Sequence, residues 1–171
     1  MVIRIAPPYD SFLDGFDKAF ARLILEFGRL EYLVKLCIKD LHGRGFTAGM
    51  LKAEQSPRQF RALCNDAKRE GSNKLTADEA SAFEEMIDSA LELADYRNDT
   101  VHAYWTMEDN APMRIRPLFN RKTKDVDWSR ARSVSVEELS SKCGAIRRLR
   151  EHLNRSRLVW SVRASKESAW L

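Results

Sequence analysis

Three side chains within six residues, Arg97, Asn98 and His102, combine a permanent cation, an amide and an imidazole. Arg97 falls on the side of a predicted helix that should face the core, where a guanidinium needs an anionic or carbonyl partner. A guanidinium can hold two phosphate oxygens, and an unperturbed imidazole titrates near neutral pH and suits proton transfer. These residue types are therefore capable of chemistry on an anionic ligand such as a phosphate ester.

Helix geometry places these side chains on different faces. At about 100° per residue, Asn98 and His102 stack if the helix continues to His102, whereas Arg97 and His102, five residues apart, do not. Arg97 would have to reach across or meet a second copy of the site. On spacing alone a structural interpretation is favoured, because such residues often complement the helix dipole or extend into solvent. A purely structural bundle would be a monomer in which Arg97 pairs with an internal acid such as Glu26 or Glu31.

Apolar residues at three- and four-residue intervals predict a frame of helices around this motif. The first runs from about Asp10 to about Leu41, and a shorter one starts at Ser56 and is closed by Gly71. A capping box at Thr76-Ala77-Asp78-Glu79 opens the helix that carries the motif, with Val101 at the centre of its inward face. A last long helix follows Ser135-Val136-Glu137-Glu138.

The segment before the last helix is irregular. Pro112 and Pro117 argue against a central strand. Residues 113–116 and 132–136 alternate in polarity, which predicts a small two-stranded flap. We therefore predict an all-α fold in one domain over residues 1–171, a bundle of about four helices with an irregular or small β-hairpin insert before the last helix.

The amino-acid composition limits the classes of protein to which this chain can belong. The chain has 171 residues, 44% of them hydrophobic and 32% charged, which is typical of a soluble globular domain. No apolar run approaches the roughly 20 residues that span a bilayer, so we expect no membrane contact and a cytoplasmic location. No Cys/His spacing indicates a metal or another cofactor. We expect buried, reduced thiols at Cys37, Cys64 and Cys143.

The charge distribution is uneven. Residues 1–111 carry 14 Lys/Arg against 19 Asp/Glu, and residues 112–171 carry 15 against 6. This basic third would attract a phosphate-rich partner, but a well-solvated surface balanced by the acidic helix explains it equally well. Trp105 and Trp128 are candidates for stacking on bases, although such residues are more often core. The basic residues that could contact such a partner are Arg114, Arg116, Arg121, Lys122, Lys124, Arg147, Arg148 and Arg150.

Residues 93–105 read Leu-Ala-Asp-Tyr-Arg-Asn-Asp-Thr-Val-His-Ala-Tyr-Trp. This segment resembles the signature of the HEPN superfamily, the higher-eukaryote and prokaryote nucleotide-binding domains. That signature is an arginine, a polar residue, a few variable positions and a histidine, which Arg97, Asn98 and His102 match. An aromatic pair such as Tyr104-Trp105 commonly follows it, and the predicted order of elements is also similar.

The resemblance implies a metal-independent endoribonuclease that acts on RNA as a homodimer, with two motifs lining one cleft. Many members are toxins, phage-defence components or RNA-processing enzymes, which adds a cognate antitoxin protein as a partner. Other members have lost the activity. The alternative is therefore a catalytically inactive module for nucleotide binding or protein interaction.

The catalytic roles follow from the chemistry of RNA, whose 2′-hydroxyl is its own nucleophile. His102 would transfer protons, and Arg97 would stabilise the charge on the pentacoordinate phosphorus. Asn98 would position His102 or the ribose, and Tyr104 would support the cleft or donate a proton. Cleavage needs both an acid and a base, yet each chain offers one histidine in the motif. A homodimer would supply the second.

Overall fold

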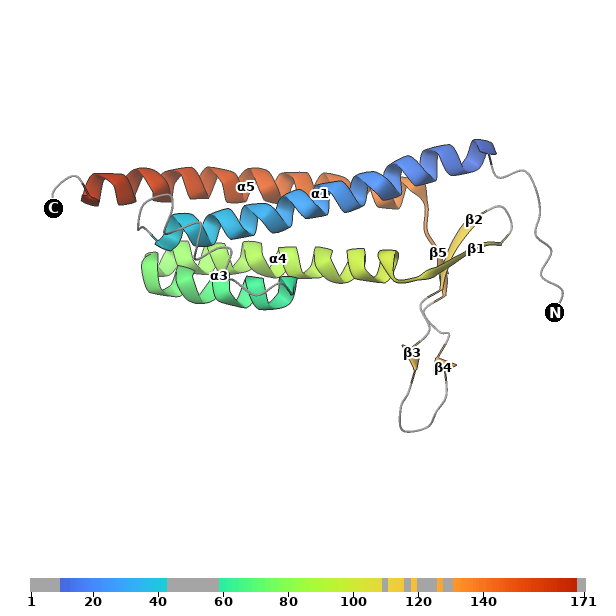
Figure 1. Cartoon of the computed structure of the whole chain (residues 1–171), viewed down its shortest axis with the longest axis horizontal. Coiled ribbons are helices and arrows are strands. Elements are labelled where there is room, and N and C mark those ends of the chain that lie inside the picture. Colours follow the sequence, from blue (N-terminus) through green and yellow to red (C-terminus); the bar gives the residue numbers. More distant parts are fainter. Residues whose placement is uncertain are drawn as a thin grey trace.

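Four long or medium helices dominate the computed structural model, which describes residues 10–42, 59–108, 111–115, 118–119, 126–127 and 131–168. They are α1 (Asp10–His42), α3 (Phe60–Lys74), α4 (Ala77–Val101) and α5 (Val136–Ser168). In Figure 1, α1, α4 and α5 run side by side along the long axis, and α3 folds back along α4. The predicted all-α bundle is confirmed, with a small antiparallel sheet before the last helix.

The core consists of the apolar stripes predicted from the helical period. Along the apolar stripes of α1 and α5, the buried positions recur at intervals of three, four or seven residues. These stripes face each other and α4, because burying an apolar side chain contributes about 1.5–3 kcal/mol. The α1 stripe is Phe16, Leu23, Phe27, Leu30, Val34, Cys37 and Leu41, and the α5 stripe is Leu139, Cys143, Ile146, Leu149, Leu153 and Trp160.

The turn between α3 and α4 matches one prediction and corrects another. The backbone N–H of Thr76 donates to Glu79 Oε2 at 3.1 Å, so the predicted capping box forms. Gly71, however, does not end α3, which continues to Lys74. A Cβ at Gly71 would lie 2.7 Å from Cδ1 of Phe83, so this glycine allows α3 and α4 to approach closely. The predicted start at Ser56 lies outside the described residues.

A three-stranded antiparallel sheet lies beyond the end of α4 (Figure 1), in the order β1 (Tyr104–Glu108), β2 (Ala111–Ile115) and β5 (Arg132–Ser133). Two shorter strands, β3 (Leu118–Phe119) and β4 (Val126–Asp127), pair separately. The predicted flap is confirmed in part, since Met113 pairs with Ser133 and Arg114 with Arg132. The strand β1 was not predicted.

Pro112 occupies the central strand, contrary to the prediction. Its carbonyl accepts the backbone N–H of Val134 at 2.9 Å. The nitrogen and carbonyl of one strand residue point to the same side, so the missing N–H faces the edge where β5 ends rather than β1. The ladder between β1 and β2 therefore loses no donor at this proline. Pro117 lies outside the described residues.

The cysteines are free and buried, as predicted. Burial raises the pKa of Cys37 and Cys64 to about 12, so both thiols stay protonated and unreactive near neutral pH. The start of α5 also follows prediction, because the Glu138 N–H donates to Ser135 Oγ at 3.1 Å. No helix among the described residues combines the length and apolar character that a bilayer crossing requires.

Candidate functional site

The last turn of α4 is fixed against the sheet through Thr100, which is fully buried. The Thr100 hydroxyl donates to the Tyr96 carbonyl at 2.8 Å and accepts from Arg114 Nη1 at 3.3 Å. The Thr100 carbonyl accepts Trp105 Nε1 at 3.0 Å. Val101 was predicted at the centre of the inward face, but in this last turn of α4 the fully buried residue is Thr100. Thr100 is tolerated there because its hydroxyl and carbonyl form hydrogen bonds with groups of both α4 and the sheet. These bonds set where the motif residues on either side point.

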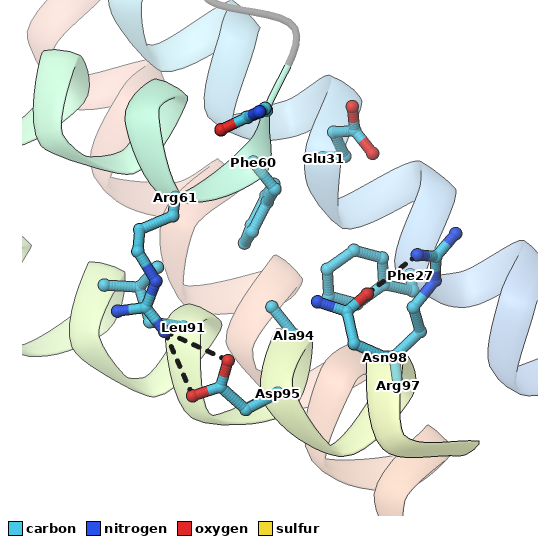
Figure 2. A pocket seen from close by; sticks show the side chains of 10 residues that line it. Phe27, Glu31, Phe60, Arg61, Leu91, Ala94, Asp95, Arg97 and Asn98 are labelled. Atoms are coloured by element: carbon cyan, nitrogen blue, oxygen red, sulfur yellow. Dashed lines mark hydrogen bonds and ion pairs between the residues drawn. The ribbon is translucent and has the colours of Figure 1, made fainter. Parts of the chain in front are cut away.

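Arg97 and Asn98 line a cavity of about 520 Å³ between α1, α3 and α4 (Figure 2). Phe27 and Phe60 form its aromatic part, with ring centroids 4.9 Å apart and the ring planes at 64°. A rim of polar groups of both signs surrounds these rings. The complete lining is Phe27, Glu31, Gln59, Phe60, Arg61, Leu91, Ala94, Asp95, Arg97 and Asn98.

Arg97 is held in this cavity without a counter-ion. Its guanidinium carbon lies 5.5 Å from the centroid of the Phe27 ring, and its Nη1 donates to Asn98 Oδ1 at 2.9 Å. Its Nε is buried and makes no hydrogen bond. In the part of the chain that the structure describes, no carboxylate forms an ion pair with it, so neither Glu26 nor Glu31 takes the role that a purely structural bundle requires. The guanidinium retains donors for a ligand.

His102 and Tyr104 lie outside this cavity. His102 caps the C-terminus of α4, where its N–H donates to the Asn98 carbonyl at 3.0 Å, and its side chain is exposed. Tyr104 begins β1 and is 67% exposed. The side-chain oxygen of Asn98 is engaged by Arg97 rather than by the imidazole. One chain therefore presents the cation and amide in the cavity and the imidazole on its own surface.

The predicted RNA-contacting residues fall into four groups. Arg114 is buried over the Tyr96 ring at 5.5 Å, and burial together with the nearby Arg132 lowers its pKa. Arg147 and Arg150 bind Glu26, whereas Arg148 is exposed on α5. Arg114 thus joins the sheet to α4 instead of facing solvent. The remaining candidates, Arg116, Arg121, Lys122 and Lys124, lie outside the described residues.

Trp105 packs into the protein. Its ring makes edge contacts with Phe16 and Phe20, at centroid distances of 5.0 and 6.0 Å. It is therefore part of the packing between α1 and the sheet, and base stacking is left without support at this position. Trp128 lies outside the described residues. Among the described residues, no cluster of His, Cys, Asp and Glu side chains could hold a metal ion.

Several cavity residues were not predicted as functional. None of Phe27, Phe60, Arg61 and Asp95 was singled out from the sequence. Arg61 Nη2 donates to Asp95 at 3.0 and 3.1 Å, which ties α3 to α4 at one side of the cavity (Figure 2). These two residues are 34 positions apart, so no local spacing indicates their contact. Only the tertiary packing of the helices brings this lining together.

The fold and the site define a helical-bundle protein with a small antiparallel insert and a cavity lined by an arginine that has no ion-pair partner among the described residues. Comparison with protein-family models, with curated proteins and with solved structures found no match to this chain. The HEPN resemblance therefore stays a prediction based on the motif, and the proposals below depend on the geometry of the site.

Proposed function

We propose that this protein is a metal-independent endoribonuclease that acts as a homodimer with a composite site. The observation that carries the proposal is Arg97, whose guanidinium lines a cavity with a buried, unbonded Nε and no ion-paired carboxylate among the described residues. An unpaired guanidinium at a cavity attracts an anion, and its planar fork matches two oxygens of a phosphodiester. His102, five residues further on, is exposed and free to act on a bound ligand.

The proposed reaction is an internal transfer of the phosphoryl group. One imidazole accepts the proton of the ribose 2′-hydroxyl, and the 2′-oxygen attacks phosphorus. Arg97 stabilises the extra negative charge in the transition state. The bond from phosphorus to the 5′-oxygen breaks, and that oxygen receives a proton from a second imidazole. The products are a 2′,3′-cyclic phosphate and a free 5′-hydroxyl.

The position of His102 is the reason for invoking a dimer. In one chain the imidazole does not line the cavity that contains Arg97. A second copy related by a two-fold axis would present its own His102 to the phosphate bound at Arg97, and the same contact would repeat in the other direction. Such an arrangement supplies the acid and the base that the reaction needs. Toxin or defence roles, and a cognate antitoxin, are extensions of this proposal from the motif.

The test is a digest of single-stranded RNA in the presence of EDTA. The wild-type protein is expected to release fragments that end in a 2′,3′-cyclic phosphate, and His102→Ala is expected to abolish cleavage. The control is His152→Ala, which removes another exposed histidine on α5 and should leave the rate unchanged. Unchanged cleavage by His102→Ala at an unchanged melting temperature would reject the mechanism.

A catalytically inactive binding module is the second candidate. The separation of His102 from the cavity favours it, because a site that only binds a nucleotide needs Arg97 and Asn98 but no imidazole. This function predicts nucleotide binding that is lost in Arg97→Ala and unaffected by His102→Ala, together with no RNA cleavage. The same pair of variants therefore separates the two functions.

A further inference from the structure

The cavity beside Arg97 has the composition of a nucleobase site. Its centre is aromatic, and Figure 2 shows Phe60 between the Arg61–Asp95 pair on one side and Phe27, Asn98 and Arg97 on the other. A volume of about 520 Å³ is within the range of small-ligand pockets. Aromatic side chains provide a surface on which an unpaired base stacks. A base in this position would lie next to a phosphate held by Arg97.

The polar rim then decides which base fits. Glu31 of α1 lines the cavity, and its carboxylate makes no hydrogen bond or ion pair among the described residues. An ionised carboxylate only accepts hydrogen bonds, so it binds a ligand that offers hydrogen-bond donors. Asp95 differs, because Arg61 already occupies both of its oxygens. Among the carboxylates that line the cavity, Glu31 is thus the one that remains available.

Asn98 supplies the complementary group. An arginine only donates hydrogen bonds, so the Asn98 atom that faces Arg97 Nη1 at 2.9 Å must be the oxygen Oδ1. The amide nitrogen Nδ2 is therefore directed to the other side, toward the middle of the cavity (Figure 2). Its two N–H groups call for acceptors on the ligand.

Only one RNA base offers this combination on adjacent atoms. Guanine presents two neighbouring donors, N1–H and the N2 amino group, which match the two oxygens of a carboxylate. It also carries the acceptors O6 and N7, which match an amide N–H. Adenine and cytosine present an amino group beside an unprotonated ring nitrogen. That nitrogen is an acceptor, so it cannot form a hydrogen bond with a carboxylate oxygen. Uracil has a single ring N–H between two carbonyls, and these carbonyl oxygens would repel a carboxylate.

Building on the ribonuclease function proposed above, we propose that the cavity is a guanine-specific subsite, in which Glu31 reads the Watson–Crick edge and Phe60 stacks on the base. Asn98 donates to the base while it holds Arg97 in place. The nucleotide bound here provides the phosphate that Arg97 contacts, so the enzyme cleaves next to guanosine. Glu31 is a specificity-determining residue and takes no part in proton transfer.

The binding test compares guanosine and adenosine monophosphates by isothermal titration calorimetry. The wild-type protein is expected to bind the guanosine nucleotide at least about tenfold more tightly than the adenosine nucleotide. A preference of this size is typical of bidentate hydrogen bonding to a base. Glu31→Gln keeps the side-chain volume and is expected to remove this preference with little change in melting temperature. The control Glu92→Gln alters an exposed acid on α4 and should keep the preference. Equal affinities in the wild type, or a preference that survives Glu31→Gln, would overturn the subsite.

A cleavage test distinguishes the subsite from the function. Mapping cut positions on an RNA of mixed sequence should show cuts next to guanosine for the wild type and a relaxed pattern for Glu31→Gln. Cleavage without base preference would reject the subsite and leave the ribonuclease intact. Guanosine-selective binding that depends on Glu31, with no cleavage at all, would reject the ribonuclease and leave the subsite intact.

Discussion

Two charged regions beside α1 differ in whether the central charged side chain has an oppositely charged partner. On the side facing α5, Glu26 is 5% exposed and is surrounded by three arginines, which form the Glu26 cluster of Glu26, Arg29, Arg147 and Arg150. On the side facing α4, Arg97 lines a cavity and has no carboxylate partner among the described residues. The first charge is satisfied within the protein, and the second is not.

The difference shows in the electrostatics of Glu26. Burial alone would raise the pKa of its carboxyl group, but Arg150, Arg147 and Arg29 together outweigh burial and lower it. Arg147 Nε lies 3.3 Å from Glu26 Oε1. This ion pair joins two residues that are 121 positions apart in the sequence. The Glu26 cluster thus connects α1 to α5, which is a structural task. Removing a guanidinium from water without such compensation is costly, and the anionic ligand proposed above would supply the compensation at Arg97.

The largest expected effect is on activity, at Arg97. Arg97→Ala should reduce RNA cleavage by about 100-fold or more, since losing one donor to a transition-state oxyanion costs a factor of that order. Because Arg97 forms no ion pair among the described residues, its loss should change the melting temperature little. Arg97→Lys should recover only part of the rate, because an ammonium lacks the planar fork. The control is Arg155→Ala, an exposed arginine on α5. If Arg97→Ala strongly lowered the melting temperature and left cleavage normal, the role of Arg97 would be structural, like that of Glu26.

The second expected effect is on stability, at Glu26. Glu26→Gln should lower the free energy of unfolding by about 2 kcal/mol, because three arginines lose their anion. The cost stays below that of a fully buried pair, since the arginine side chains are 30–63% exposed and water can replace part of the interaction. Urea unfolding measures the change, and Glu92→Gln should have almost none. A loss of cleavage with unchanged stability in Glu26→Gln would reverse the roles of the two regions.

The same cluster predicts a dependence of stability on pH. The folded-state pKa of Glu26 is lowered, so its contribution is fully present above the unfolded value of about 4.3 and is lost as the pH falls through the folded value. Wild type and Glu26→Gln should therefore differ in unfolding free energy at neutral pH and converge in acid. A difference that stays constant down to the acid transition would contradict this assignment.

Two glycines that lie within helices of the structure are expected to respond to alanine with opposite signs. Gly71→Ala should destabilise the fold by about 1–3 kcal/mol, because the new Cβ would lie 2.7 Å from the ring of Phe83, which is itself buried. Gly28→Ala should stabilise it by about 0.5–1 kcal/mol, because Gly28 is exposed within α1 and a Cβ there meets nothing within 4 Å. Thermal unfolding of both variants checks the opposite signs.

Local patterns predicted the helices well and the insert less well. The capping boxes and apolar stripes depend on contacts within four residues, so the ends of α1, α4 and the start of α5 could be placed from the sequence. Pro112 misled the prediction, because its tolerance in a central strand depends on where β5 stops. The Arg114 side chain was assigned to the surface, whereas it is buried against Tyr96 and Thr100 from another element.

The sequence by itself determined the helical frame and the presence of Arg97, Asn98 and His102 near the end of one helix, because helical period and capping are local properties. Tertiary structure alone decided that Glu26 has arginine partners while Arg97 has no carboxylate partner within the described segments, and that Glu31 and Phe60 join Arg97 around one cavity. The physical reason is that the pairing and burial of a charge depend on which helices pack together. Residues far apart in the chain set that packing.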